Sequence, residues 1–137
     1  MGKLLQEINA AAREGGVMGV WSLVVKASER DKLREQAKAR AKKYGISVKE
    51  NGNLSPPKGY PDKASEYGDP VSYKYPCDAE HAQPAVNYYN QSGQRSDGGY
   101  STAEWTIIGR RIARLVNRHL DAKWKYEDGK LVKKEGD

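Results

Sequence analysis

The sequence predicts a mainly α fold: a small helical domain with a Tyr/Pro-rich extended connector and a short C-terminal β-hairpin. Leu, Ile and Val make up 22 of the 137 residues, or 16%, which is below the roughly 20% typical of a globular core. All six prolines and seven of the nine tyrosines lie between residues 56 and 100, and proline disfavours regular elements. The clearest apolar repeat, over 105–116, has helical spacing. We therefore expect a reduced helical core with looser flanks.

The N-terminal segment 1–27 combines an amphipathic helix with an apolar stretch. Residues 3–14 place apolar side chains at helical spacing, and Gly15 and Gly16 would end that helix. Residues 17–26 are apolar and rich in β-branched side chains, so a buried strand and a helix fit them equally well.

Residues 28–50 are expected to form a basic helix and a short strand. The helix covers 29–44, because acidic residues at its start and basic residues at its end complement the helix dipole, and a glycine follows its last turn. Its apolar face is thin and mostly alanine, so it would bury little surface. Residues 46–48 indicate a short strand before an Asn-Gly turn. The residues that mark the helix ends are Ser28, Glu29 and Asp31, then Lys42, Lys43, Gly45 and Ile46.

Residues 51–66 are expected to be a flexible linker, and residues 67–120 a compact helical domain. The stretch 54–76 contains five prolines, and each one fixes φ and removes a backbone donor. We therefore expect an irregular, extended connector. Its tyrosines can hold it against a helix by burying their rings while the hydroxyls stay in contact with water.

The strongest local signal predicts a helix over 102–120 at the centre of the core. Ser101 and Glu104 match the capping box, in which each side chain bonds the other residue's backbone N–H. Tyr100 and Trp105 are spaced as a hydrophobic staple around that cap. The apolar stripe that follows would face the core. It consists of Trp105, Ile108, Ile112, Leu115, Val116 and His119.

Two further elements flank this helix in the sequence. A shorter helix should follow the N-cap residue Asp78, with an initial turn at 79–82 and the helix proper over 84–90, because Pro84 lies too deep for a free first-turn position. Residues 121–137 should form a hairpin around an Asp-Gly turn, followed by a charged tail.

Several classes of protein are disfavoured by composition. The longest apolar run is far shorter than the roughly 20 residues of a membrane helix, and no signal-peptide pattern precedes it. Cys77 is the only cysteine, which excludes an internal disulfide and a cysteine-based zinc cluster. His81 and His119 have no ligand-spaced partner. We therefore expect no metal, no cofactor and no enzymatic activity.

Two basic stripes suggest an alternative function in nucleic-acid binding. Arg34, Lys38 and Lys42 recur at i+4 spacing, as do Arg110, Arg114 and Arg118 beside Arg111, so each set lies along one helix edge and could follow a phosphate backbone. The simpler interpretation, which we favour, is that these side chains solvate the outer helix faces. A tyrosine platform for single-stranded nucleic acid is also disfavoured. Residues 51–100 carry only four Lys or Arg against six Asp or Glu.

The order of motifs resembles a small domain of unknown function found in bacteriophage and prophage proteins. The resemblance rests on the run from Tyr67 to Pro76 (YGDPVSYKYP), the cap at Asp78 and the run 99–112 (GYSTAEWTIIGRRI). Residues 40–46 resemble a segment that often precedes this domain, so the likeness covers roughly residues 36–119. Such domains are sometimes appended to head-maturation or scaffold-type polypeptides. The chain departs from the pattern at Cys77, at Pro84 and in the hairpin after residue 120.

The resemblance implies a non-catalytic protein-interaction module in particle assembly or host interaction. It supplies no catalytic residues. The expected partner is another protein, from phage or host, and the expected location is the bacterial cytoplasm or the virion. We assign structural roles to the residues that carry the pattern. They are Asp69, Pro70, Tyr73, Tyr75, Pro76, Asp78, Ser101, Glu104, Trp105, Ile108 and Ile112.

Replacement of Ile112 by Ala tests the predicted core stripe. If Ile112 is buried, Ile112→Ala should lower the free energy of unfolding by about 2–5 kcal/mol, because it removes apolar contacts and leaves a cavity. Urea denaturation measures this change. A near-neutral result would show that the stripe faces solvent.

Overall fold

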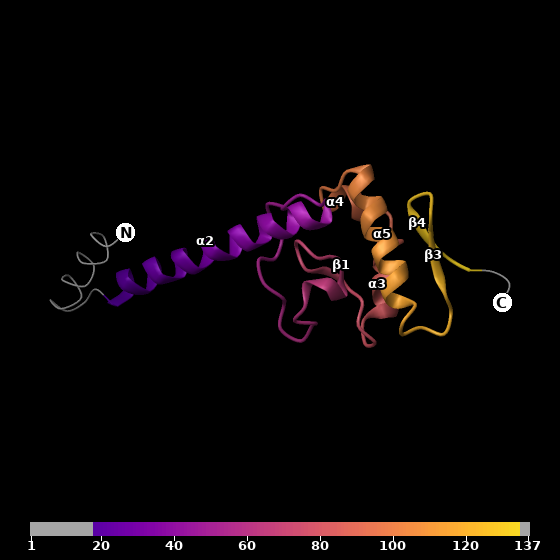
Figure 1. The fold of residues 1–137 in the computed structure, drawn as a ribbon, viewed down its shortest axis with the longest axis horizontal. Coiled ribbons are helices and arrows are strands. Elements are labelled where there is room, and N and C mark those ends of the chain that lie inside the picture. Colours follow the sequence, from indigo (N-terminus) through magenta and orange to yellow (C-terminus); the bar gives the residue numbers. More distant parts are fainter. Residues whose placement is uncertain (1–17, 135–137) are drawn as a thin grey trace. The chain divides into compact units, whose positions relative to one another are not determined.

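The computed structural model describes residues 18–134, with side chains from residue 28 onward. Backbone contacts divide the chain into two units, with the boundary between Gln36 and Ala37. The helix predicted over 3–14 lies outside the described residues. The second unit contains every element described below except the N-terminal part of the first helix (Figure 1).

Helix α2 spans Met18–Tyr44 and starts eleven residues earlier than the sequence predicts. The ambiguous stretch 17–26 is helical from Met18 onward, and Ser28 lies inside the helix rather than at its N-cap. No proline interrupts this stretch, so the helix continues through Ser28. A residue that is suited to capping does not by itself start a helix. The predicted end is confirmed: Gly45 follows with φ 74°, and its N–H donates to the Ala41 carbonyl.

The strand predicted over 46–48 is absent. This segment is irregular, with Ile46 buried in the core. The Ser47 N–H donates to the Glu104 carboxylate at 2.7 Å. That donor therefore bonds a side chain rather than a neighbouring strand, and a turn closes at Gly52, whose N–H donates to the Lys49 carbonyl.

The predicted mainly α class is wrong, because the second unit combines helices with two small antiparallel sheets. In one sheet β1 pairs with β2, and in the other β3 pairs with β4. In chain order, the elements after α2 are the 3₁₀ helix η1 (Ala64–Glu66), β1 (Tyr67–Asp69), β2 (Lys74–Pro76), α3 (Ala82–Tyr89), α4 (Gln94–Asp97), α5 (Thr102–Val116), β3 (Trp124–Glu127) and β4 (Lys130–Lys133).

The predicted extended connector forms the β1–β2 hairpin instead. Tyr67 pairs with Pro76, and Asp69 pairs with Lys74. The prolines are compatible with this pairing, because Pro70 lies in the turn and Pro76 is the last residue of β2, positions at which a missing N–H breaks few ladder bonds. The hairpin packs on α5, as expected for the connector.

Helix α5 begins as predicted but ends earlier. The capping box between Ser101 and Glu104 is present, and the Tyr100 and Trp105 rings lie 5.7 Å apart, which confirms the staple. The helix ends at Val116 rather than residue 120. The Asn117 side chain accepts a hydrogen bond from the Trp124 N–H and donates to the Trp124 carbonyl.

The stripe of α5 forms the core, with one correction. Five of its six predicted members are buried, whereas His119 is exposed, because it follows the end of the helix. Gly109 allows Tyr89 of α3 and Tyr126 of β3 to lie close to the α5 backbone, because a Cβ there would overlap the Tyr89 hydroxyl and the Tyr126 ring. The buried members of the stripe are Trp105, Ile108, Ile112, Leu115 and Val116.

Helix α3 contains Pro84 as its third residue, whereas we expected the helix proper to begin at 84. The first N–H groups of a helix have no partner within it, so proline is tolerated there. Asp78 does not cap this helix, because its carboxylate bonds His81 Nδ1 at 2.8 Å. The short helix α4 was not predicted.

The C-terminal hairpin is observed where the sequence placed it. Asp128 and Gly129 have φ values of 48° and 85°, as the favoured two-residue hairpin turn requires. The Asn90 amide bonds both the N–H and the carbonyl of Leu131, and Trp105 Nε1 donates to the Gly129 carbonyl. The hairpin is thus fastened to α3 and α5 (Figure 1).

The Glu104 carboxylate joins the cap of α5 to the segment after α2, which gives a prediction on acid stability. It accepts hydrogen bonds from Ser101, Ser47 and Lys49. Burial by itself would raise the pKa of Glu104, but these bonds lower it to about 2. A carboxylate with a lowered pKa stabilises the fold above its ordinary pKa of 4.5 and loses that stabilisation as pH falls.

We expect Glu104→Gln to lower the free energy of unfolding by about 1–3 kcal/mol at pH 7, since the glutamine keeps the capping pattern but loses the charge. The difference in the free energy of unfolding between the wild type and Glu104→Gln should shrink as pH falls from about 4.5 towards 2. Thermal unfolding across this pH range measures it. A difference independent of pH would contradict the assigned role of the charge.

Candidate functional site: a tyrosine-lined groove

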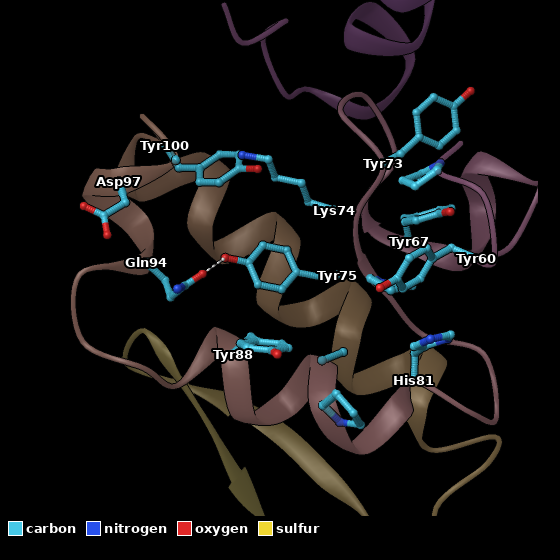
Figure 2. A pocket seen from close by; sticks show the side chains of 15 residues that line it. Tyr60, Tyr67, Tyr73, Lys74, Tyr75, His81, Tyr88, Gln94, Asp97 and Tyr100 are labelled. Carbon is cyan, nitrogen blue, oxygen red and sulfur yellow. Dashed lines mark hydrogen bonds between the residues drawn. The ribbon is translucent and has the colours of Figure 1, made fainter. Parts of the chain in front are cut away.

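The second unit contains a groove of about 620 Å³ with an aromatic lining. Its walls come from the β1–β2 hairpin, from α3, from α4 and the residues after it, and from the loop before η1. In Figure 2 the Tyr75 ring lies between the rings of Tyr88 and Tyr100 and points towards Gln94. The volume falls in the range of about 300–1,000 Å³ typical of ligand pockets. The tyrosines that line it are Tyr60, Tyr67, Tyr73, Tyr75, Tyr88 and Tyr100.

Two of these tyrosines have left-handed backbone conformations. Tyr73 has φ 52° and Tyr75 has φ 60°, a region that costs about 1–3 kcal/mol for a residue other than glycine. The surrounding structure maintains it. Arg40 from α2 donates to the carbonyls of Pro70 and Val71 at 2.9 and 3.0 Å, and its guanidinium lies 4.6 Å from the centre of the Tyr73 ring.

Arg40 was not identified as a key residue from the sequence. It lies among several basic residues of α2, and its residue type does not distinguish it from them. The bonds that single it out join residues thirty or more positions apart. No signal in this one sequence could have found them.

The inner tyrosines have hydroxyls that bond protein atoms, contrary to the expectation that they would contact water. The Tyr75 hydroxyl donates to Gln94 Oε1 at 2.8 Å, and the Tyr67 hydroxyl donates to the Pro61 carbonyl. The Tyr100 hydroxyl donates to the buried carboxylate of Asp69. Burial raises the pKa of Tyr75 and of Tyr100, and the Asp69 charge raises both further.

The outer tyrosines are exposed. Tyr60 and Tyr88 have 44% and 54% of their surface accessible, and the Tyr60 ring lies 4.6 Å from the ring of His81. Within the described residues, neither of these hydroxyls forms a hydrogen bond. The groove therefore combines an inner wall of fixed rings with two accessible rings at its opening (Figure 2).

Acidic groups lie at both ends of the groove. At one end the Asp78 carboxylate bonds the lining residue His81, and the charges of Asp78, Asp62 and Glu66 reinforce burial in raising the pKa of Tyr67 to about 12. Asp97 lies at the other end, on α4. Among the described residues that line the groove, Lys74 is the one Lys or Arg and Asp97 the one Asp or Glu. In the part of the chain that the structure describes, neither Asp97 nor Lys74 has a side-chain hydrogen bond or ion pair.

The basic residues of the second stripe divide into two groups. Arg111 is half-buried and donates to the carbonyls of Tyr67 and Gly68 at 2.8 and 3.2 Å, so it is not available to bind a phosphate. Burial lowers the pKa of Arg111. The other three arginines, Arg110, Arg114 and Arg118, are exposed.

The first stripe lies on one helix but belongs to two units. Arg34 is part of the first unit, whereas Lys38 and Lys42 are part of the second. All three side chains are exposed.

The side chains that could act in catalysis or metal binding are engaged in other contacts. The Cys77 thiol is buried and bonds the Tyr75 carbonyl, and burial raises its pKa to about 12, so it carries almost no thiolate at neutral pH. Asp78, Glu80 and His81 have ligand-type atoms within 4.8 Å of one another. Because Asp78 already bonds the His81 ring, the pair satisfies itself without a metal.

No family model, curated protein or solved structure matches this chain. Among the helices of the described residues, none has the length and apolar character needed to cross a membrane.

Tyr100→Phe tests the contact that holds the inner wall. Removing the hydroxyl leaves the buried Asp69 carboxylate with one donor fewer, so we expect the free energy of unfolding to fall by about 1–3 kcal/mol. Tyr88→Phe is the matched control, because it removes an exposed hydroxyl and should change stability by less than about 0.5 kcal/mol. Chemical denaturation measures both. Equal stabilities for the two variants would contradict the role of Tyr100.

Proposed function

We propose that this protein is a non-catalytic protein-interaction module that binds its partner in the tyrosine-lined groove. The observation that carries the proposal is the pairing of accessible Tyr60 and Tyr88 with a fixed aromatic wall. Tyrosine is enriched at binding hot spots, because it offers a large apolar area together with a hydrogen-bonding hydroxyl. On the resemblance noted above, the setting is bacteriophage particle assembly or contact with a host protein.

The chemistry of the groove supports binding rather than catalysis. The buried Cys77 thiol carries almost no thiolate at neutral pH, and the described residues that line the groove include no serine, threonine or cysteine that His81 could activate. Rings of fixed orientation lose little conformational freedom when a partner binds. The strained backbone at Tyr73 and Tyr75 fits the same interpretation, since such strain clusters at ligand sites.

Nucleic-acid binding through Arg110, Arg114 and Arg118 is the second candidate. It is favoured by the exposure of all three side chains. It is weakened by the engagement of Arg111 with Tyr67 and Gly68, which leaves three phosphate contacts at most on this face. Binding through three contacts would weaken with salt at a slope of about −3 in log affinity against log salt.

An affinity pull-down distinguishes the two candidates. The immobilised full chain, a Tyr60→Ser/Tyr88→Ser double variant and Arg114→Glu are each exposed to lysate from phage-infected or prophage-induced cells, with and without nuclease treatment. We expect the wild type and Arg114→Glu to retain a protein that the double variant loses. Both substituted sites are exposed, so little loss of stability is expected. Retention by all three proteins, or by none, would contradict the proposal. Retention lost with nuclease and with Arg114→Glu would favour nucleic acid.

A further inference from the structure

We propose that the groove binds an extended, proline-containing peptide segment that is flanked by Lys or Arg. This inference rests on the proposed function and adds the chemical class of the partner. It follows from the ring arrangement, the free hydroxyls, the strand edge and the distribution of charge around the groove.

The ring arrangement suits a polyproline II ligand. The accessible rings of the groove are Tyr60, from the loop before η1, and Tyr88 of α3, whereas Tyr75 and Tyr100 of its inner wall are only 8% and 3% exposed (Figure 2). Proline rings can pack against the two accessible rings, and a polyproline II segment is already ordered before it binds. Binding then requires little further ordering of the ligand.

The free hydroxyls supply the hydrogen bonds that such a ligand needs. A polyproline II segment has no internal hydrogen bonds, so its carbonyls are open to donors. The exposed hydroxyls of Tyr60 and Tyr88 have no partner in the described part of the chain, and both residues line the groove. They can donate to ligand carbonyls without breaking a bond of the fold.

The edge of the β1–β2 hairpin does not suit the addition of a β-strand. The groove wall includes Lys74, Tyr75 and Pro76 of β2. Pro76 has no N–H, and strand addition requires a row of main-chain donors and acceptors. With only three residues in the strand, a ladder could not extend far. The side chains, rather than the backbone, are therefore the binding surface.

The charge distribution favours basic flanks on the ligand. Asp97 lies unpaired at one end, and at the other end the Asp78 carboxylate bonds the lining residue His81. A segment with Lys or Arg on each side of its prolines would meet opposite charge at both ends. The same distribution disfavours single-stranded nucleic acid, because Lys74 is the one Lys or Arg among the described residues that line the groove.

A titration followed by NMR tests the proposal on the ¹⁵N-labelled full chain. The probe is the synthetic peptide Lys-Pro-Pro-Ala-Pro-Pro-Arg. Its controls are the same peptide with Gly for each Pro, the same peptide with Glu for Lys and Arg, and an oligothymidylate. We expect shifts confined to residues around the groove with the first peptide, and at least about tenfold weaker binding of both peptide controls.

Variants of the chain locate the binding. Tyr88→Ala should weaken binding of the probe peptide by about tenfold. Asp97→Asn should weaken it by about twofold to fivefold, with a smaller effect at high salt. Asn87→Ala is the matched control, because Asn87 is exposed on the same helix outside the groove and should leave affinity unchanged.

The outcomes separate this inference from the proposed function. No shift with the probe at about 1 mM, which would mean a binding free energy weaker than about −4 kcal/mol, would overturn the proline assignment. So would equal binding of the glycine peptide, or stronger binding of the oligothymidylate. If capture of the pull-down partner still depends on Tyr60 and Tyr88 in that case, the proposed function holds and only the assigned class of ligand is wrong. If the probe binds but no partner depends on these tyrosines, the proposed function fails instead.

Discussion

The buried carboxylate of Asp69 is the interaction on which the second unit depends. One of its oxygens accepts from the N–H groups of Val71 and Ser72 and so closes the turn between β1 and β2. The other accepts from the Tyr100 hydroxyl, one residue before the N-cap of α5. A fully buried carboxylate is tolerated only when its lone pairs are satisfied. The hairpin turn and the start of α5 therefore form together.

Two arginines secure the same segment from outside. Arg111 of α5 donates to carbonyls of Tyr67 and Gly68, and Arg40 of α2 donates to carbonyls of Pro70 and Val71. Three-residue strands leave many carbonyls without a ladder partner, and an unpaired buried carbonyl is costly. Side-chain donors from two helices supply the hydrogen bonds that neighbouring strands of a longer sheet would otherwise provide to these carbonyls. This explains how so short a hairpin is stable next to a helix.

The groove is a consequence of this construction. Asp69 holds Tyr100, Gln94 holds Tyr75, and Arg40 packs on Tyr73, so three of the lining rings are fixed, two of them by residues outside the groove. Tyr60 and Tyr88 remain accessible. The segment that appeared from composition to be a connector therefore contributes a wall of the binding surface that we propose. Its function depends on the same contacts that stabilise the fold.

Local sequence was sufficient for the features whose partners lie a few residues apart. The capping box of Ser101 and Glu104, the end of α2 at Gly45 and the Asp-Gly hairpin all depend on backbone groups within one turn, and all are observed. The buried stripe of α5 follows from helical spacing alone. These features could be predicted because the energy that favours them comes from neighbours in the chain.

Tertiary structure decided the rest. The strand character of 67–76 requires the Asp69 turn and two distant arginines, the loss of a strand at 46–48 follows from the Glu104 carboxylate, and the early end of α5 accompanies the Asn117 bonds to Trp124. The groove itself is assembled from four separate segments. Composition could show that tyrosines were concentrated in the middle of the chain, but not which rings would be buried. That depends on which hydroxyl finds a buried acceptor, and such pairing between distant residues is set only when the chain is folded.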